Sequence, residues 1–219
     1  MNIDNKRVNK EHYRFQDYVD WRRWHSYYYQ IREALGSDSK TFLIIGKGDG
    51  IVPLVLGYLL NSEGWVVDTF DYAEDLCPTY QGDLRDIERI INKKYDCVIC
   101  CQVLEHLEWQ YFEAVLESLA RICSKRLIVS LPVRITEFSI YADLPRQRYI
   151  KRLNVIFQKL WIKKLPRNDE HCWEVGIKGK SKKYVKSVIE KYIHVEKDFH
   201  VPGYSYHWFV IGTPICCEG

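Results

Sequence analysis

The chain has 219 residues, of which 47% are hydrophobic and 28% are charged, and its formal net charge at pH 7 is +3. These values favour one folded domain with a full core, exclude a disordered chain and argue against a dedicated nucleic-acid protein. No apolar run reaches the ~20 residues of a membrane span, and residues 1–15 lack the apolar stretch of a signal peptide, so we expect a soluble cytoplasmic protein.

The first predicted elements are one or two helices between residues 11 and 35, where aromatic side chains recur at three- and four-residue spacings. The apolar run "TFLII" at 41–45 predicts a short buried strand, and "IVPLVLGYLLN" at 51–61 predicts a buried helix. A second strand is expected at 65–71, and the pattern over 83–94 favours another helix.

The same alternation continues along the chain. A third strand is expected at 95–102, an amphipathic helix at 108–123, and a fourth strand at 126–132, which Pro132 ends. Strands that alternate with helices favour a parallel sheet with crossover connections, which is the doubly wound α/β class.

The last third of the chain has a different character. Residues 141–166 predict a basic helix, 181–192 predict a second one, and 194–201 with 205–212 predict an antiparallel hairpin. No linker or repeat separates these parts, so we expect a single domain over 1–219. Its expected parts are an N-terminal helical cap (1–38), a cofactor-binding core (39–132), a lid and substrate segment (133–180), and a final helix with a β-hairpin (181–219).

Eight cysteines raise the question of a zinc site or disulfides. Cys97 and Cys100 form the single C-x-x-C pair, and they lie in an apolar run rather than at zinc-ribbon spacing. Cys216 and Cys217 are adjacent near the tail. We therefore expect reduced and mostly buried thiols.

Three alternating glycines, Gly46, Gly48 and Gly50, follow the first predicted strand and precede a helix. Glycines allow backbone N–H groups to approach a ligand, and a helix N-terminus favours negative groups. The dinucleotide pattern G-x-G-x-x-G would need glycine where Ile51 stands, and the phosphate-loop pattern is also missing. NAD and ATP therefore fit poorly. Two interpretations of the loop remain open: it binds a smaller nucleoside ligand, or it is a tight turn that binds no ligand.

Two acidic residues downstream strengthen the nucleoside interpretation. Asp71 ends the second strand about 20 residues after the glycines, where a carboxylate can accept bonds from both ribose hydroxyls; Asp68 is its competitor but lies farther from the strand end. Asp83 and Leu84 follow the small Gly82 and suit an adenine, because the acid can accept from the amine while the leucine packs on the ring. Each acid on its own can equally be a helix cap.

In sequence order, "FLIIGKGDG", "VVDTFDYAEDLCPTYQGDL", "YDCVICCQVLEHL" and "RLIVSLP" resemble the successive motifs of class I S-adenosylmethionine-dependent methyltransferases, most closely the type 11 and type 23 groups. The segments 18–35, 171–189 and 201–211 also resemble these enzymes, so the resemblance covers most of the chain. It implies a Rossmann-like, mostly parallel seven-stranded sheet with an antiparallel last strand, and S-adenosyl-L-methionine as the cofactor.

The resemblance also implies roles for single residues. By this resemblance, the three glycines face the methionine part of the cofactor. Asp71 binds the ribose, and Tyr72 lies beside the adenine. Asp83 and Leu84 lie at the adenine edge, and Gln102 lies near the sulfonium. The chain departs from the family at Ile44, where many members have an acid that positions the loop and the methionine amino group.

Methyl transfer is an in-line displacement in which the cofactor brings the reactive group and the protein brings orientation and a base. Glu105 and His106, in "QVLEHL", are the first catalytic candidates, and capping of the following helix is their alternative role. The stretch resembles the E-x-x-E-H metal pattern of coenzyme-Q-type and small-RNA methyltransferases. Gln102 replaces its first acid and is a poorer ligand for a hard cation, so no metal site is predicted.

A second group of candidates lies in the loop "NDEHCWEVG", where His171, Trp173 and Glu174 suit a polar substrate. His207, on the terminal hairpin, can approach the same region. We expect His106 before His171 as the base, although a structural role is the alternative for each histidine.

Basic residues outnumber acids between 144 and 197, and they cluster with aromatics over 146–167. This pattern is typical of a solvated lid helix, and it also suits a polar or anionic acceptor, a peripheral membrane contact or RNA. We expect methyl transfer to an oxygen or nitrogen of a small polar acceptor such as a sugar or a glycan precursor. The rivals are a cofactor-binding regulator without catalysis, which Ile44 favours, and an RNA methyltransferase that uses the basic segment.

Overall fold

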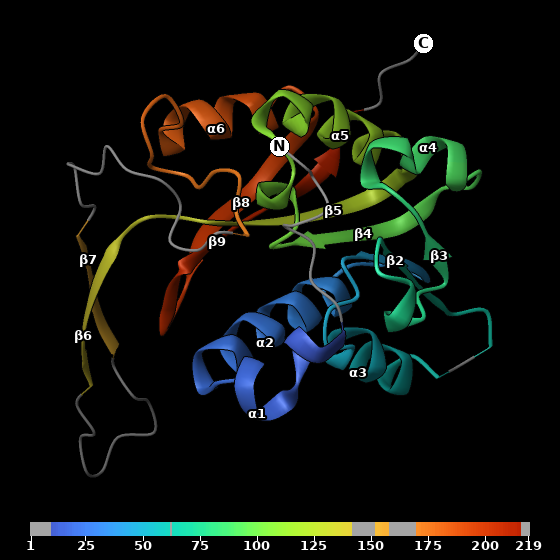
Figure 1. The fold of residues 1–219 in the computed structure, drawn as a ribbon, viewed down its shortest axis with the longest axis horizontal. Helices are drawn as coiled ribbons and strands as arrows, with labels where there is room; N and C mark the ends of the chain where they lie inside the picture. The colour runs from blue at the N-terminus through green and yellow to red at the C-terminus, as the bar shows by residue number, and fades with distance from the viewer. Residues whose placement is uncertain (1–9, 62, 142–151, 158–169, 216–219) are drawn as a thin grey trace.

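The computed structural model describes residues 10–61, 63–141, 152–157 and 170–215 (Figure 1). Its centre is a seven-stranded sheet in the order β3-β2-β1-β4-β5-β9-β8. The strands are β1 (Thr41–Ile45), β2 (Val66–Asp71), β3 (Tyr80–Gln81), β4 (Tyr95–Cys101), β5 (Cys123–Pro132), β8 (Ile193–Val201) and β9 (Tyr204–Pro214).

Strands β1 to β5 pair in parallel, whereas β9 is antiparallel to both β5 and β8. The central strands carry near-continuous apolar runs because helices cover both of their faces. Pro202 and Gly203 make the turn between β8 and β9, and Gly203 has a positive φ of 80°. The predicted doubly wound sheet with an antiparallel C-terminal hairpin is therefore confirmed.

Helices form a layer on each side of this sheet (Figure 1). One layer contains α4 (Ile87–Ile90), α5 (Trp109–Ile122) and α6 (Lys182–Ile189), and the other contains α2 (Trp21–Leu35) and α3 (Ile51–Leu59). Helix α5 shows why they pack in this way, since Phe112, Val115, Leu116 and Leu119 form one buried apolar stripe along it. Within the described residues, no helix is both long enough and apolar enough to cross a bilayer.

The expected N-terminal helices are present and fall into two groups. Helix α2 lies on the sheet, where Tyr27 and Ala34 join the same buried cluster as Phe42 of β1 and Phe209 of β9. Asp20 caps its N-terminus by accepting a hydrogen bond from the Arg23 backbone N–H at 2.8 Å. The preceding η2 (Lys10–Tyr13) and α1 (Phe15–Tyr18) lie nearer the carboxyl ends of the strands.

Short 3-10 helices occupy the loops at those carboxyl ends: η3 (Glu74–Leu76), η4 (Leu84–Asp86) and η5 (Leu104–His106). The helix predicted over 83–94 is consequently shorter than expected, since η4 and α4 together end at Ile90. Ile91 is already extended and buried.

The prediction of a basic helix over 141–166 is wrong for the part that the structure describes. Residues 152–157 form strand β7 (Arg152–Phe157), which pairs antiparallel with β6 (Thr136–Tyr141) in a separate two-stranded ribbon. This ribbon extends away from the sheet beyond the end of β5 (Figure 1). "RLNVIF" combines β-branched and aromatic residues, which favour strands. The rest of the predicted lid helix, with most of its basic cluster, lies outside the described residues.

The six described cysteines are free thiols: Cys97, Cys100 and Cys123 are buried, Cys101 and Cys172 are half-buried, and Cys77 is exposed. Burial raises the pKa of the Cys97 and Cys100 thiols well above its ordinary value, so these groups stay protonated inside the sheet. Cys216 and Cys217 lie outside the described residues.

Candidate functional site

The glycine loop joins β1 to α3 at the carboxyl edge of the sheet. Gly46, Gly48 and Gly50 all have positive φ, with values of 78°, 56° and 78°. At Gly46 space is also restricted, because an added Cβ would lie 2.5 Å from Val103 Cγ2. Gly50 is the N-cap residue of α3 and has the left-handed conformation. The first glycine therefore allows a close approach to the β4 loop, and the third turns the chain into the helix.

Lys47 ties this loop to the segment after β2. Its backbone N–H donates to Asp71 Oδ2 at 2.7 Å, and its ammonium donates to the carbonyls of Leu76 at 2.6 Å and Cys77 at 2.7 Å. These bonds hold the two loops in a fixed relation before any ligand is present.

A cavity lies between these loops, and most of the predicted cofactor residues line it. It contains Gly46, Asp71, Tyr72, Asp83, Leu84, Gln102 and His106, together with Tyr13, Val103 and Leu107. Gly48 lines an adjoining cavity, and Gly50 is outside the lining of both. The walls combine apolar side chains with a few polar groups, namely the two carboxylates, the amide, the His106 imidazole and two tyrosines, as is usual for a site that binds a small molecule.

The two candidate acids of β2 have different surroundings. Asp71 lines the cavity, and its Oδ1 accepts the Ala73 backbone N–H at 3.0 Å. Asp68 instead accepts from Lys93 Nζ at 3.0 Å and from the Tyr95 hydroxyl at 2.6 Å. Of the two, Asp71 is the one placed to meet a ligand.

Asp83 both caps a helix and lines the cavity. Its Oδ1 accepts the Arg85 backbone N–H at 2.9 Å, which makes it the N-cap of η4. The Arg85 guanidinium also binds it through Nε at 2.9 Å and Nη2 at 2.6 Å. This bidentate pair fixes the direction of the carboxylate beside Leu84.

The adjoining cavity brings together two charged side chains that the sequence analysis did not single out. Arg23 of α2 and Asp49 of the glycine loop line it with Gly48 and Ile44. Arg23 Nε donates to the Tyr18 carbonyl at 2.8 Å, whereas Asp49 accepts from the Tyr27 hydroxyl and, at 3.0 Å, from the Ile51 N–H. Ile44 itself is buried against the apolar cluster under α2. In the sequence, Arg23 and Asp49 stand out only as charged residues in the stretches "DWRRW" and "GKGDG", and nothing there indicates that they share a cavity.

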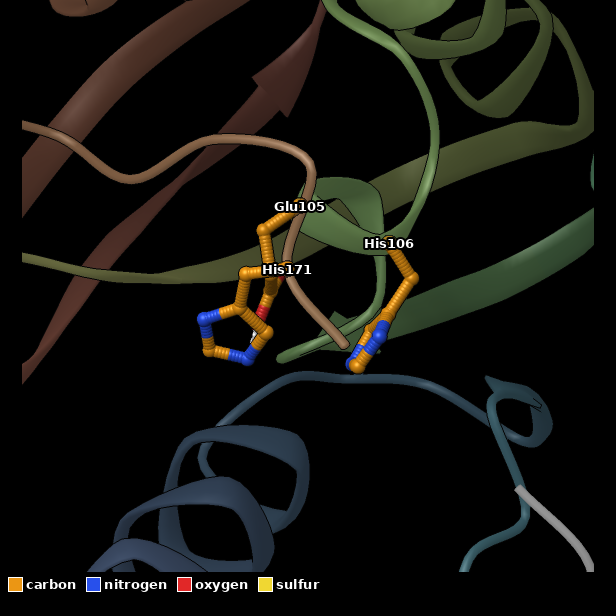
Figure 2. Close-up of side chains that lie close together, drawn as sticks. All are labelled: Glu105, His106 and His171. Carbon is orange, nitrogen blue, oxygen red and sulfur yellow. Dashed lines mark ion pairs between the residues drawn. The ribbon is translucent and has the colours of Figure 1, made fainter. Parts of the chain in front are cut away.

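Glu105, His106 and His171 were expected as two separate groups, yet the structure brings them together (Figure 2). Helix η5 carries the first two, and the loop before α6 carries the third. That loop is tied to η5 by the Cys172 N–H, which donates to the Glu105 carbonyl at 2.7 Å, and by Trp173 Nε1, which donates to the Leu107 carbonyl at 3.1 Å.

Trp173 has a structural role, which corrects its expected part in substrate contact. Its indole is buried, with ring centroids 4.7 Å from Trp109 and 5.0 Å from Phe112 of α5. Burial of this large side chain anchors the loop that carries His171.

The carboxyl group of Glu105 is shielded from solvent. It is fully buried, and within the described residues neither of its side-chain oxygens has a hydrogen-bond partner. Burial raises its pKa to about 7, against the opposing effect of the nearby His171. His171 Nε2 lies 3.9 Å from Glu105 Oε1, too far for a hydrogen bond.

His171 is oriented from its other side. Its Nδ1 lies 3.1 Å from Glu174 Oε1, and the same oxygen accepts from the Tyr206 hydroxyl at 2.6 Å. Burial acts to lower the pKa of His171, but the Glu174 bond and the charges of Glu105 and Glu174 outweigh it, so the pKa is raised. Arg134 Nε, 3.2 Å from Glu174 Oε2, compensates the charge of that acid.

A polar cavity lies beside this group and continues from the first. Its lining includes His106, His171, His207, Gln102, Arg23, Asp17, Glu170, Tyr18, Tyr204 and Tyr206. His207 therefore does approach the same region, although it is buried, with its Nδ1 2.8 Å from Ser26 Oγ. One cavity with apolar walls and carboxylates thus adjoins one with histidines and phenols.

No protein-family model and no curated protein matches this chain. Solved structures do match its fold. The chain is similar to the N-methyltransferase NodS from Bradyrhizobium japonicum in complex with S-adenosyl-L-homocysteine, with 10% identity, a TM-score of 0.59, and coverage of 97% of this chain and 96% of that one.

Two further structures show how widely this fold is used. The glycopeptide N-methyltransferase MtfA with S-adenosyl-L-methionine matches with 13% identity and a TM-score of 0.52 over 90% of this chain and 95% of that one. The small RNA methyltransferase HEN1 matches with 14% identity and a TM-score of 0.58 over 88% of this chain and 25% of that one. The chain therefore has the class I methyltransferase fold, whose members are named for very different acceptors.

Proposed function

We propose that the protein is an S-adenosyl-L-methionine-dependent methyltransferase that acts on an oxygen or nitrogen of a small polar acceptor. The observation that carries this proposal is the cavity at the carboxyl edge of β1, β2 and β4, where a bare glycine backbone, Asp71, Asp83 and Leu84 surround one space. Their chemistry fits a ribose and an adenine, and the fold is that of proteins crystallised with this cofactor.

Each part of the cofactor has a counterpart in the lining. Asp71 would accept from the ribose hydroxyls, because each of its oxygens keeps a lone pair beyond its bond to the backbone. Leu84 and Tyr72 would contact the adenine, and Asp83 would accept from its amine. Gln102, held by a 3.0 Å bond from its Nε2 to Ser130 Oγ, would lie beside the sulfonium.

The methionine end would enter the adjoining cavity. There Arg23 can bind its carboxylate, and Asp49 can bind its ammonium group, which supplies the charge that Ile44 does not. A zwitterion needs opposite charges at a fixed spacing, and these two side chains are each held by other bonds. This arrangement removes the support that Ile44 gave to a degenerate cofactor site.

The bound cofactor supplies an electrophilic methyl group. The protein must hold the acceptor in line with it and deal with the acceptor's proton. His106 and His171 line the polar cavity beside Gln102, and Glu105 lies buried next to them, so we assign the three this task, with His106 Nε2 as the proton acceptor. The polar lining of that cavity supports a hydroxyl-rich or charged small molecule, such as a sugar.

Calorimetric titration with S-adenosyl-L-methionine and S-adenosyl-L-homocysteine tests the proposal. We expect micromolar binding by the wild type and a loss of at least tenfold in affinity in Asp71→Asn. Asp68→Asn is the matched control, because it makes the same change on the same strand outside the cavity. If the folded wild type binds neither compound, the methyltransferase proposal fails.

A further inference from the structure

The side chains of Glu105, His106 and His171 lie close together, although they come from two distant segments (Figure 2). One ligand atom from each lies within 4.8 Å of the others. Three atoms at this spacing lie roughly 3 Å from a common centre, so movements of about 1 Å bring each to the 2.0–2.2 Å of a metal–nitrogen or metal–oxygen bond. The group already has nearly the dimensions of a coordination site.

The buried carboxyl group is the second, independent sign of a ligand. Glu105 is fully buried, and within the described part of the chain neither oxygen has a hydrogen-bond partner. Such a group costs stability unless it is paired, hydrogen-bonded or bound to a cation. The imidazole nitrogen His171 Nε2 lies 3.9 Å from Glu105 Oε1, which is too far to satisfy it.

Both imidazoles are oriented by groups behind them. His171 Nδ1 faces Glu174 Oε1 at 3.1 Å, and His106 Nδ1 faces the Glu170 carbonyl at 3.2 Å. Both partners are acceptors, so each Nδ1 carries the proton and each Nε2 presents its lone pair. A carboxylate or carbonyl behind a ligating histidine is the usual outer support of a metal site.

The donor set also selects the kind of cation. Two imidazole nitrogens and one carboxylate suit zinc, iron, cobalt or manganese, whereas magnesium and calcium prefer oxygen ligands. The amide of Gln102, three positions before Glu105, is bound to Ser130 Oγ at 3.0 Å and adds no charge. The set therefore differs from an oxygen-rich site for a hard cation.

We propose that Glu105, His106 and His171 bind one divalent transition-metal ion at the edge of the acceptor cavity. The proposal departs from the expectation, drawn from the sequence, that no metal binds here. The binding stands on the geometry alone, and only its use rests on the proposed function. Open positions on the cation would take the acceptor's oxygen or nitrogen, orient it and lower its pKa, so that its proton could leave to solvent. His106 would then be a ligand instead of the proton acceptor.

Equilibrium dialysis of the full-length, chelator-treated and reduced protein against Co²⁺, Mn²⁺ and Mg²⁺, without cofactor, tests the site. We expect one equivalent of Co²⁺ or Mn²⁺, at least tenfold weaker binding of Mg²⁺, and a rise in Tm with the bound ion. Glu105→Gln keeps the shape of the side chain and should weaken Co²⁺ binding at least tenfold without lowering Tm in the absence of metal. His171→Asn should do the same to binding.

Two controls separate this site from other histidines and thiols. His194→Asn, at an exposed position of β8, should leave binding unchanged. Cys172→Ser should also leave it unchanged, although its thiol lies 3.3 Å from the His106 carbonyl. Absence of Co²⁺ and Mn²⁺ binding by folded wild type, equal binding by Glu105→Gln, or a sulfur-to-cobalt charge-transfer band in the absorption spectrum would overturn the proposal.

The same samples distinguish this proposal from the methyltransferase proposal. Cofactor titration depends on Asp71, in the other cavity, and is measured without metal. Cofactor binding with no cation binding would remove only the metal site. Cation binding with no cofactor binding would leave the metal site standing and remove its use in methyl transfer.

Discussion

At the scale of single residues, the two cavities proposed to hold the cofactor differ in charge. Carboxylates that are already hydrogen-bonded to backbone N–H groups define the first, and Arg23 with Asp49 places opposite charges in the second. Because these groups are held before a ligand arrives, binding need not pay for their ordering.

Arg23 gives a prediction about one end of the cofactor. A hydrogen bond to a charged partner contributes about 1.5–3 kcal/mol, so Arg23→Gln should weaken S-adenosyl-L-homocysteine binding by roughly tenfold or more. Binding of 5′-methylthioadenosine, which has no amino-acid part, should be unaffected. Parallel titrations with both ligands measure the difference, and equal losses would show that Arg23 acts on the fold of the cavity instead.

His207 gives a prediction about pH. Burial, with smaller effects of Arg23 and His171, holds its pKa well below 6.5, and its ring also faces Tyr204 with 4.2 Å between centroids. Below pH 6.5 the unfolded chain gains a proton here that the folded chain does not bind. The free energy of unfolding should therefore fall as the pH decreases from 6.5, by up to about 1.4 kcal/mol per pH unit from this residue.

Urea unfolding at pH 7.5, 6.5 and 5.5 measures this effect against His207→Asn, which keeps a polar atom near Ser26 Oγ. The variant should lose stability less steeply than the wild type between pH 6.5 and 5.5, and the two should have similar slopes above pH 6.5. Identical slopes over the acidic interval would contradict the assignment of a neutral buried imidazole.

At the scale of elements, the glycine loop and its contact with the β4 loop form one unit. The positive φ of Gly46 and the nearness of Val103 act at the same position, so conformation and space both exclude a side chain there. Gly57, in the middle of α3, has neither restriction. Its φ is not positive, and no atom lies within 4 Å of an added Cβ.

Alanine substitutions at these two glycines should therefore have opposite effects. Gly46→Ala should lower the free energy of unfolding by about 2 kcal/mol or more, from backbone strain and the clash, and should weaken cofactor binding. Gly57→Ala should raise it by about 0.5–1 kcal/mol, because alanine is the better helix former. Adding Val103→Ala to Gly46→Ala should recover part of the lost free energy of unfolding, because it removes the clash. Urea unfolding of Gly46→Ala, Gly57→Ala and the double variant measures these changes.

At the scale of the whole molecule, stability is concentrated in the middle of the sheet. Both faces of β4 and β5 are covered by helices, and most of their residues are buried. Strand β3 has two residues, and β8 is an edge strand with several exposed positions. Local opening should begin at these edges and at the loops of the site.

Amide hydrogen exchange should show this gradient. Amides of Ile99 and Val129 should exchange only with global unfolding, whereas those of β3 and β8 should exchange earlier. S-adenosyl-L-homocysteine should slow exchange most at residues 46–49 and 71–73. Protection of β8 equal to that of β4, or ligand protection far from these loops, would contradict the proposed order of stability or the position of the site.

Local patterns were sufficient to predict much of this molecule. Apolar runs and helical spacings identified the strands and the main helices in order, because those signals depend on neighbours within a few residues. The glycine loop and Asp71 could also be located, because each directly follows or ends a predicted strand. The carboxyl ends of parallel strands meet at one edge of the sheet, so the two could be placed near each other. The basic helix predicted over 141–166 was wrong at 152–157, because pairing with β6 makes this segment a strand and a local pattern does not reveal that partner.

The relation between distant segments was decided only by the tertiary structure. Sequence determined that Glu105 and His106 begin a helix and that His171 lies in a loop, but the two segments are tied by bonds that span 66 positions, such as the one from Trp173 Nε1 to the Leu107 carbonyl. Burial of Trp173 against α5 brings them together, and the same packing removes solvent from Glu105. A side chain's neighbours and its exposure depend on which surfaces pack together, and no short-range pattern contains that information.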